Sequence, residues 1–166
     1  SVMSKIEPTG HNIHNILVLS LSGLGDTLML TPSFKIVRRN FPNAKIVALV
    51  MTRGAYEILL DNKNIDELIY WNFYQKKFWQ SLNFALQLRK RRFQFTFFSY
   101  PANHVIYNVL NFLIGSTWRP IHRYSHLNSI SAGFLNHQVI HEDDSLHHVE
   151  ENLRLLAAVG LDISSA

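Results

Sequence analysis

The chain has 166 residues, of which 47% are apolar and 17% charged, and its formal net charge is +4. This length fits about one domain, and the composition excludes a disordered chain and a collagen-like repeat. Because there is no cysteine, a disulfide framework and a thiolate metal site are excluded too. The apolar runs are shorter than the roughly 18 residues of a spanning helix, and the N-terminus lacks the apolar stretch of a signal peptide. We therefore expect a cytoplasmic domain.

Predicted strands and helices alternate along the chain. Short apolar runs with polar borders predict buried strands at residues 15–20, 45–50, 67–71 and 93–99, with short further strands at 116–122 and 138–140. Apolar residues at helical spacing predict helices at residues 28–40, 56–60, 78–92, 105–114 and 145–159. Alternation of this kind favours right-handed crossovers and a parallel sheet with helices on both faces. The expected fold is α/β and Rossmann-like.

Several residues mark the expected helix ends. Pro32 is tolerated if it lies in the first turn of its helix. Gly115 and Gly160 each follow an apolar helical pattern and are expected to close it. Asp144 or Ser145 is expected to cap the last helix.

Charge is unevenly distributed. No Asp or Glu occurs between Leu68 and His141, whereas the same stretch contains eight Lys and Arg residues. Six aromatic residues are interleaved with the first of these: Trp71, Phe73, Tyr74, Phe78, Trp79 and Phe84. Such a stretch fits an anionic partner, such as nucleic acid, phospholipid headgroups or a phosphorylated substrate. The alternative is that the basic residues simply solvate helix faces.

The loop after the first strand is the best candidate for a ligand site. Ligands of open parallel sheets bind at the carboxyl ends of the strands, where this chain has Ser20-Leu21-Ser22-Gly23-Leu24-Gly25-Asp26. Two glycines would allow a tight turn and a close approach to a ligand. Free amides at the start of the next helix could hold an anion.

This loop does not match a dinucleotide site. Gly23 and Gly25 begin the glycine fingerprint, but Leu28 stands where the third glycine belongs. Met51-Thr52-Arg53 replaces the acidic residue that would bind a ribose. The absence of Gly-Lys-Ser/Thr also excludes a P-loop.

Asp26 has two interpretations. As an N-cap, its carboxylate would accept hydrogen bonds from amides of the first helical turn. As a general base, it would need a free oxygen within reach of the proton it takes. The two roles compete, because capping favours the ionised carboxylate and makes it a weaker base.

The order of motifs resembles glycosyltransferase family 9, the ADP-heptose:lipopolysaccharide heptosyltransferases. Residues Ile16–Pro32 are similar to the family's opening strand, small-residue turn, Gly-Asp pair and Pro-containing helix. Residues 38–46 and 62–69 resemble its entries into the second and third strands, and residues 147–161 its His-x-Val-Glu-x-Asn-Leu helix. Residues 97–104 depart from the polar segment usual in the family, so the acceptor pocket is expected to differ.

The resemblance implies a GT-B enzyme with two Rossmann-like domains, of which this chain would be the N-terminal, acceptor-side half. Residues 1–14 would be a tail, 15–162 the domain and 163–166 the start of the interdomain linker, with the donor domain absent. Asp26 would be the general base of an inverting transfer from ADP-heptose to the lipopolysaccharide inner core. No cofactor or metal is implied, and the fragment is expected to be inactive alone.

Further residues are candidates for substrate binding. The resemblance places Ser22, Gly23, Leu24, Gly25, Thr27 and His147 at the substrate. Residues Tyr100, Asn103 and His104 follow the fourth strand and could hydrogen-bond a sugar, or serve only as local helix caps. Basic and aromatic residues 71–92 could contact the inner membrane as a peripheral surface.

Two alternatives remain. The acidic and histidine residues at 141–148 could ligate a metal, but their spacing favours a solvated loop. The chain could instead be a non-catalytic Rossmann-like module that binds a nucleotide or RNA. We expect no nucleic acid, because no RNP-type or helix-turn-helix pattern is present.

Overall fold

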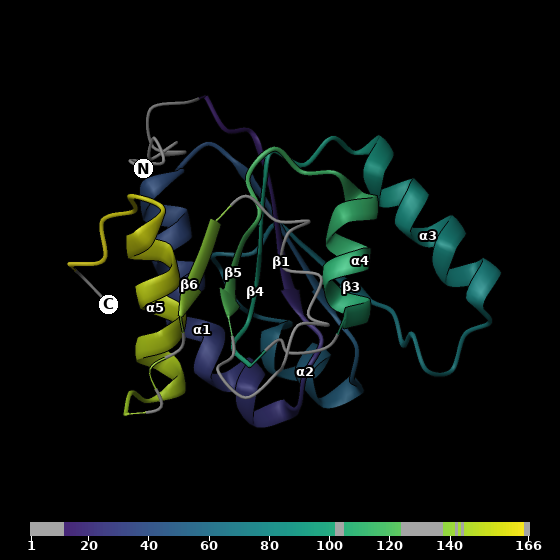
Figure 1. The fold of residues 1–166 in the computed structure, drawn as a ribbon, viewed down its shortest axis with the longest axis horizontal. Coiled ribbons are helices and arrows are strands. Elements are labelled where there is room, and N and C mark those ends of the chain that lie inside the picture. The colour runs from purple at the N-terminus through teal and green to yellow at the C-terminus, as the bar shows by residue number, and fades with distance from the viewer. Residues whose placement is uncertain (1–11, 102–104, 124–137, 142, 144, 165–166) are drawn as a thin grey trace.

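The computed structural model describes residues 12–101, 105–123, 138–141, 143 and 145–164 (Figure 1). Its main sheet has four parallel strands in the order β3-β2-β1-β4. The strands are β1 (Asn15–Ser20), β2 (Lys45–Val50), β3 (Glu67–Tyr70) and β4 (Phe95–Phe98). β1 lies inside the sheet and is buried from Ile16 to Ser20, as its continuous apolar run predicts.

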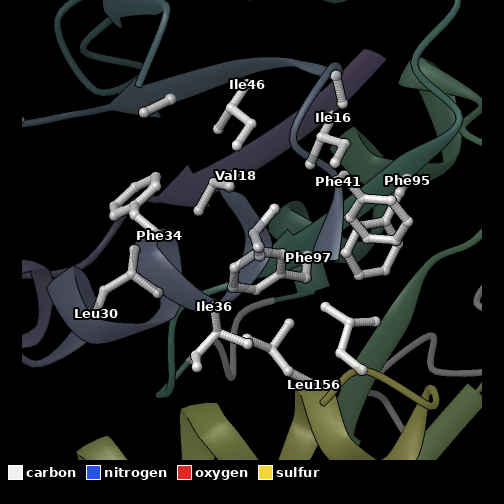
Figure 2. Close-up of a cluster of buried hydrophobic side chains, with 14 of the residues drawn as sticks. Ile16, Val18, Leu30, Phe34, Ile36, Phe41, Ile46, Phe95, Phe97 and Leu156 are labelled. Atoms are coloured by element: carbon white, nitrogen blue, oxygen red, sulfur yellow. The ribbon is translucent and has the colours of Figure 1, made fainter. Parts of the chain in front are cut away.

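Helices cover both faces of the sheet, which confirms the expected Rossmann-like architecture. One face packs against α1 (Leu24–Asn40), α2 (Arg53–Leu59) and α5 (His148–Ala158). Figure 2 shows this core, where side chains of β1 such as Ile16 and Val18 meet Phe34 and Ile36 of α1. The other face packs against α3 (Phe78–Lys90) and α4 (Val105–Ile114).

The fifth and sixth strands form a small parallel ladder of their own. They are β5 (Pro120–Arg123) and β6 (Gln138–His141). A single bridge between Phe95 and Trp118 connects this ladder to the edge of β4. The Thr96 amide donates to the Trp118 carbonyl at 3.0 Å, and the Trp118 amide donates to Gln94 at 2.8 Å. The sheet therefore continues through one point of contact beyond β4.

α1 begins earlier than the sequence predicts. It starts at Leu24, so Pro32 lies inside the helix rather than in its first turn. A proline there removes one backbone donor to the carbonyl four residues earlier, which is that of Leu28. The Thr31 hydroxyl donates to this carbonyl at 2.7 Å and replaces the missing bond.

The helix ends agree with the glycine predictions and correct one cap. Gly115 and Gly160 close α4 and α5 with φ values of 73° and 86°, in the left-handed region that glycine adopts without strain. The N-cap of α5 is His147, not Asp144 or Ser145. No helix in the described part of the chain is long and apolar enough to cross a membrane.

Candidate functional site

Asp26 lies at the carboxyl edge of the sheet, in the first turn of α1. It is the third residue of the helix, and its Oδ2 accepts the amide of the N-cap residue Gly23 at 3.2 Å. Asp26 therefore supplies one half of a capping box, the bond back to the N-cap amide, and is not the N-cap itself; Gly23 has no side chain to supply the other half. Its other oxygen, Oδ1, lies 3.4 Å from Nδ1 of His148. One carboxylate oxygen thus holds the loop while the other faces a histidine.

His148 comes to Asp26 from the far end of the sequence. It is the first residue of α5, which packs beside α1. The Tyr100 ring, from the loop after β4, meets the His148 ring edge to face with 5.0 Å between centroids. Asp26, His148 and Tyr100 therefore form a cluster from three segments that the fold brings to one edge.

Asn152 fixes the geometry of this cluster. Its side chain is fully buried, and its Oδ1 accepts the Tyr100 amide at 2.8 Å. Its Nδ2 donates to the His148 carbonyl at 2.9 Å. Because a buried amide is costly to leave unpaired, these bonds tie the loop after β4 to the first turn of α5.

Hydroxyl groups hold the loop between β1 and α1 in place through hydrogen bonds. Ser22 and Ser99 share a hydrogen bond of 3.3 Å between their Oγ atoms. The Tyr107 hydroxyl donates to the Leu21 carbonyl at 3.0 Å. Burial raises the pKa of the Tyr107 phenol above its ordinary value, and a hydrogen bond with Tyr74 raises that pKa further. Tyr107 therefore stays a neutral donor under the site loop.

Thr27 was predicted to contact the substrate, but its side chain lies inside the fold. Its side chain is fully buried, where Oγ1 lies 2.8 Å from Ser20 Oγ and donates to the Gly23 carbonyl at 3.1 Å. This corrects the prediction of a substrate contact, because the hydroxyl points into the fold. Thr27 fixes the loop that carries Asp26.

Gly23 and Gly25 leave the backbone beside Asp26 accessible to a ligand, and they do not form a tight turn. Gly23 has φ −68° and ψ 174°, which any residue can adopt. A Cβ atom added at Gly25 would have no neighbour within 4 Å. The exposed backbone beside Asp26 is therefore open to a ligand, and the side chains of Leu24 and Leu28 stand exposed on the same helix.

His147 serves as a helix cap, and its neighbour His148 is the residue that sequence reasoning missed. The Val149 amide donates to His147 Nδ1 at 3.4 Å, and the His147 amide donates to Glu150 at 2.9 Å. Glu150 fits the third helical position of a capping box, but the pattern calls for Ser or Thr at the N-cap, so the sequence alone does not assign His147 to the cap. His148 is the first helical residue, and its ring lies beside Asp26.

Some of the predicted site residues are not described by the structure. Asn103 and His104 lie outside the described residues, as do Glu142 and Asp144 of the possible metal cluster. Within the described ranges, no three His, Asp or Glu side chains come together in a way that could hold a metal ion.

Comparison with known proteins finds similar folds among solved structures. No protein-family model and no curated protein matches the sequence. The solved structure of a glycosyl transferase family 9 protein from Veillonella parvula matches with a TM-score of 0.76 and 18% identity, over 91% of this chain. The E. coli heptosyltransferase WaaC matches over 92% of this chain, at 0.72 and 17% identity with ADP and at 0.72 and 15% with ADP-2-deoxy-2-fluoro heptose.

This chain has the fold of one half of a family 9 glycosyltransferase. It spans 43%, 49% and 50% of those three chains, so it corresponds to about half of each. The α/β, Rossmann-like fold expected from the sequence is confirmed. Because the identities are below 20%, the likeness establishes architecture, and the chemistry has to be argued from the site.

Proposed function

We propose that this chain is the acceptor-side domain of an inverting glycosyltransferase that transfers heptose from ADP-heptose to the lipopolysaccharide inner core. The observation that supports it most is the placement of Asp26. Its carboxylate is partly exposed at the carboxyl edge, where ligands of parallel sheets bind. It stands beside the open backbone of Gly25, in a fold shared with family 9 glycosyltransferases.

In this proposal Asp26 Oδ1 is the general base. It takes the proton of an acceptor hydroxyl as that oxygen bonds to the anomeric carbon of the donor. The bond from the anomeric carbon to the diphosphate breaks, ADP leaves with the electron pair, and configuration inverts. The proton ends on Asp26.

The capping bond does not remove this capacity. Oδ2 accepts the Gly23 amide and fixes the carboxylate orientation, whereas Oδ1 remains on the side of His148. A base must be held in position to take a proton, and the bond at Oδ2 positions the carboxylate while Oδ1 takes the proton. The rings of Tyr100 and His148, which pack on each other beside Oδ1, would then contact the acceptor sugar.

The nucleotide-sugar donor would be held by a second domain across a cleft from this one. The exposed Leu24 and Leu28 side chains lie on the helix that begins at the site and would line this cleft. In the same proposal, residues 15–162 form the acceptor-side domain, and the linker to the second domain begins at residue 163.

Ligand binding by this chain tests the proposal against the rival nucleotide-binding module. We expect inner-core oligosaccharide to bind in calorimetry and ADP to bind weakly or not at all. Tyr100→Ala should weaken oligosaccharide binding, while Phe112→Ala, which changes an exposed aromatic residue near the C-terminal end of α4, should not. Tight ADP binding without oligosaccharide binding would support the rival module and contradict the proposal.

A further inference from the structure

Exposed aromatic side chains gather at the start of α3. Tyr74, Phe78 and Trp79 are 71%, 71% and 74% exposed, the largest fractions of any large apolar side chain in the described residues. Trp71 and Phe84, by contrast, stack on each other with 4.1 Å between ring centroids and pack on the core. An exposed cluster of this kind marks an interaction site more often than a random surface does.

Two lysines complete this surface, which we call the α3 tip and define as Tyr74, Lys76, Lys77, Phe78 and Trp79. Both lysines are exposed, and they belong to the stretch from Leu68 to His141 that contains no acidic residue. The tip is therefore aromatic and positively charged at once.

Two of the basic residues at the other end of α3 are engaged elsewhere. Arg91 forms an ion pair with Glu67 at 2.5 Å, and Arg89 donates to the Leu113 carbonyl at 3.0 Å. Lys90 and Arg92 at that end are exposed, but no strongly exposed aromatic side chain accompanies them, so the tip is the part of residues 71–92 that combines lysines with exposed aromatic rings.

The tip lies on the same edge of the sheet as Asp26. The loop to α3 follows β3, and the loop to α1 follows β1, so both leave the carboxyl ends of parallel strands. Tyr74 reaches Tyr107, whose hydroxyl donates to Leu21 in the site loop. Figure 1 shows α3 projecting from the body of the molecule, with its N-terminal end outermost, so the tip protrudes.

We propose that the α3 tip docks the protein on a bilayer that carries anionic lipid headgroups. Phe78 and Trp79 enter the interfacial region, which suits amphipathic aromatic rings, and Lys76 and Lys77 meet the headgroups. Docking at the tip would bring the carboxyl edge, with Asp26, toward the membrane surface. This inference does not depend on the proposed glycosyl transfer.

The geometry favours a membrane over RNA or a second copy of the chain. The Phe78 and Trp79 rings meet at 72° with 5.2 Å between centroids, and therefore offer no parallel platform for stacked bases. Single-strand binding proteins also track the backbone in a groove, whereas this tip protrudes. Two copies would bring their lysines together without an acidic residue in the tip to pair them.

Vesicle sedimentation tests the proposal with this chain. We expect binding to vesicles of phosphatidylglycerol and phosphatidylcholine, and little binding to phosphatidylcholine alone. The double variant Phe78→Ser/Trp79→Ser should lower the partition coefficient at least about tenfold. Phe112→Ser should leave it unchanged, because Phe112 is an exposed phenylalanine near the opposite end of the neighbouring helix α4.

Charge is tested with a second matched pair. Lys77→Gln should weaken binding to the anionic vesicles about fivefold, the effect of about one lysine near a charged surface. Lys63→Gln should have little effect, because Lys63 lies in the loop that enters β3 from the opposite edge.

Tryptophan emission supplies a readout that reports on the tip itself. The emission should shift to the blue when anionic vesicles are added, and Trp79→Phe should remove most of that shift while binding persists. Equal binding to both vesicle types, or equal losses from Phe78→Ser/Trp79→Ser and Phe112→Ser, would overturn the proposal. So would tip-dependent dimerisation or RNA binding in the absence of vesicle binding.

Discussion

At the residue scale, two adjacent histidines have different structural roles. His147 caps α5, while His148 lies 3.4 Å from Asp26. The motif resemblance pointed to His147, because sequence spacing does not reveal which side chain a helix start turns toward the sheet. Asp26 itself was identified from the loop, since a carboxylate after the first strand of a parallel sheet falls at the carboxyl edge.

The first prediction compares these two histidines in the proposed two-domain enzyme. His148→Ala should lower kcat about tenfold to a hundredfold, because the Asp26 carboxylate loses a neighbour that orients it. His147→Ala should leave kcat near that of the unchanged protein and lower stability by about 0.5 kcal/mol through the weakened cap. Steady-state kinetics and chemical denaturation measure both, and equal kcat losses would contradict the assignment.

The second prediction concerns Asn152, which positions the cluster without facing the ligand. Asn152→Ala should destabilise the fold by about 1–3 kcal/mol, because the Tyr100 amide and the His148 carbonyl lose a buried partner. Asn83→Ala, on the exposed surface of α3, should change stability by less than about 0.5 kcal/mol. Urea denaturation of both variants tests this, and matching values would rule out a special role for Asn152.

At the element scale, the strands were predicted closely and the start of α1 was not. The continuous apolar runs of β1 and β2 leave little alternative to a buried parallel strand. The run Gly23-Leu24-Gly25 predicts a turn, because glycine disfavours helix. The helix nevertheless starts at Leu24, where the hydrogen bond from the Gly23 amide to the Asp26 carboxylate stabilises the first turn. Local propensity alone does not capture such a side-chain bond.

An ion-pair network between β2, β3 and the end of α3 makes stability depend on pH. Hydrogen bonds from Arg91, and a further one from Lys45, lower the pKa of Glu67 from its ordinary 4.5 to about 2, against the opposing effect of burial. A carboxyl with a lowered pKa stabilises the folded state above its unfolded pKa, and this contribution is lost as pH falls through the folded value.

The third prediction follows from this direction of the pH dependence of stability. Glu67→Gln should be less stable than the unchanged protein at pH 6, and the difference should shrink as pH falls from about 4.5 to about 2. Glu57→Gln, an exposed acid on α2, should show no such convergence. Denaturation midpoints across this pH range provide the measurement, and a gap that stays constant would contradict the network.

At the scale of the whole molecule, the described part of the chain is a parallel sheet with a hydrophobic core on each face and the candidate site at its carboxyl edge. The two-faced core follows from the sequence, because alternating apolar runs and amphipathic helices specify it. The cluster of Asp26, His148 and Tyr100 could not be derived in the same way. It depends on α5 packing beside α1, a contact between segments more than a hundred residues apart.

The attachment of the short β5–β6 ladder could not be predicted from the sequence either. Both strands were predicted near their observed places, but their attachment to β4 rests on one bridge at Trp118. Periodicity cannot predict where a sheet stops pairing continuously, because that depends on long-range geometry.

The central claim is that Asp26 is the base of a glycosyl transfer. Its most direct test is single-turnover transfer with Asp26→Asn in the proposed two-domain enzyme. Asparagine preserves size and can still accept the Gly23 amide, so the fold and acceptor binding should persist while the chemical step slows about 10²–10⁴-fold. Asp61→Asn, an exposed acid in the turn after α2, is the matched control and should transfer normally. A transfer rate for Asp26→Asn close to that of the control would contradict the account.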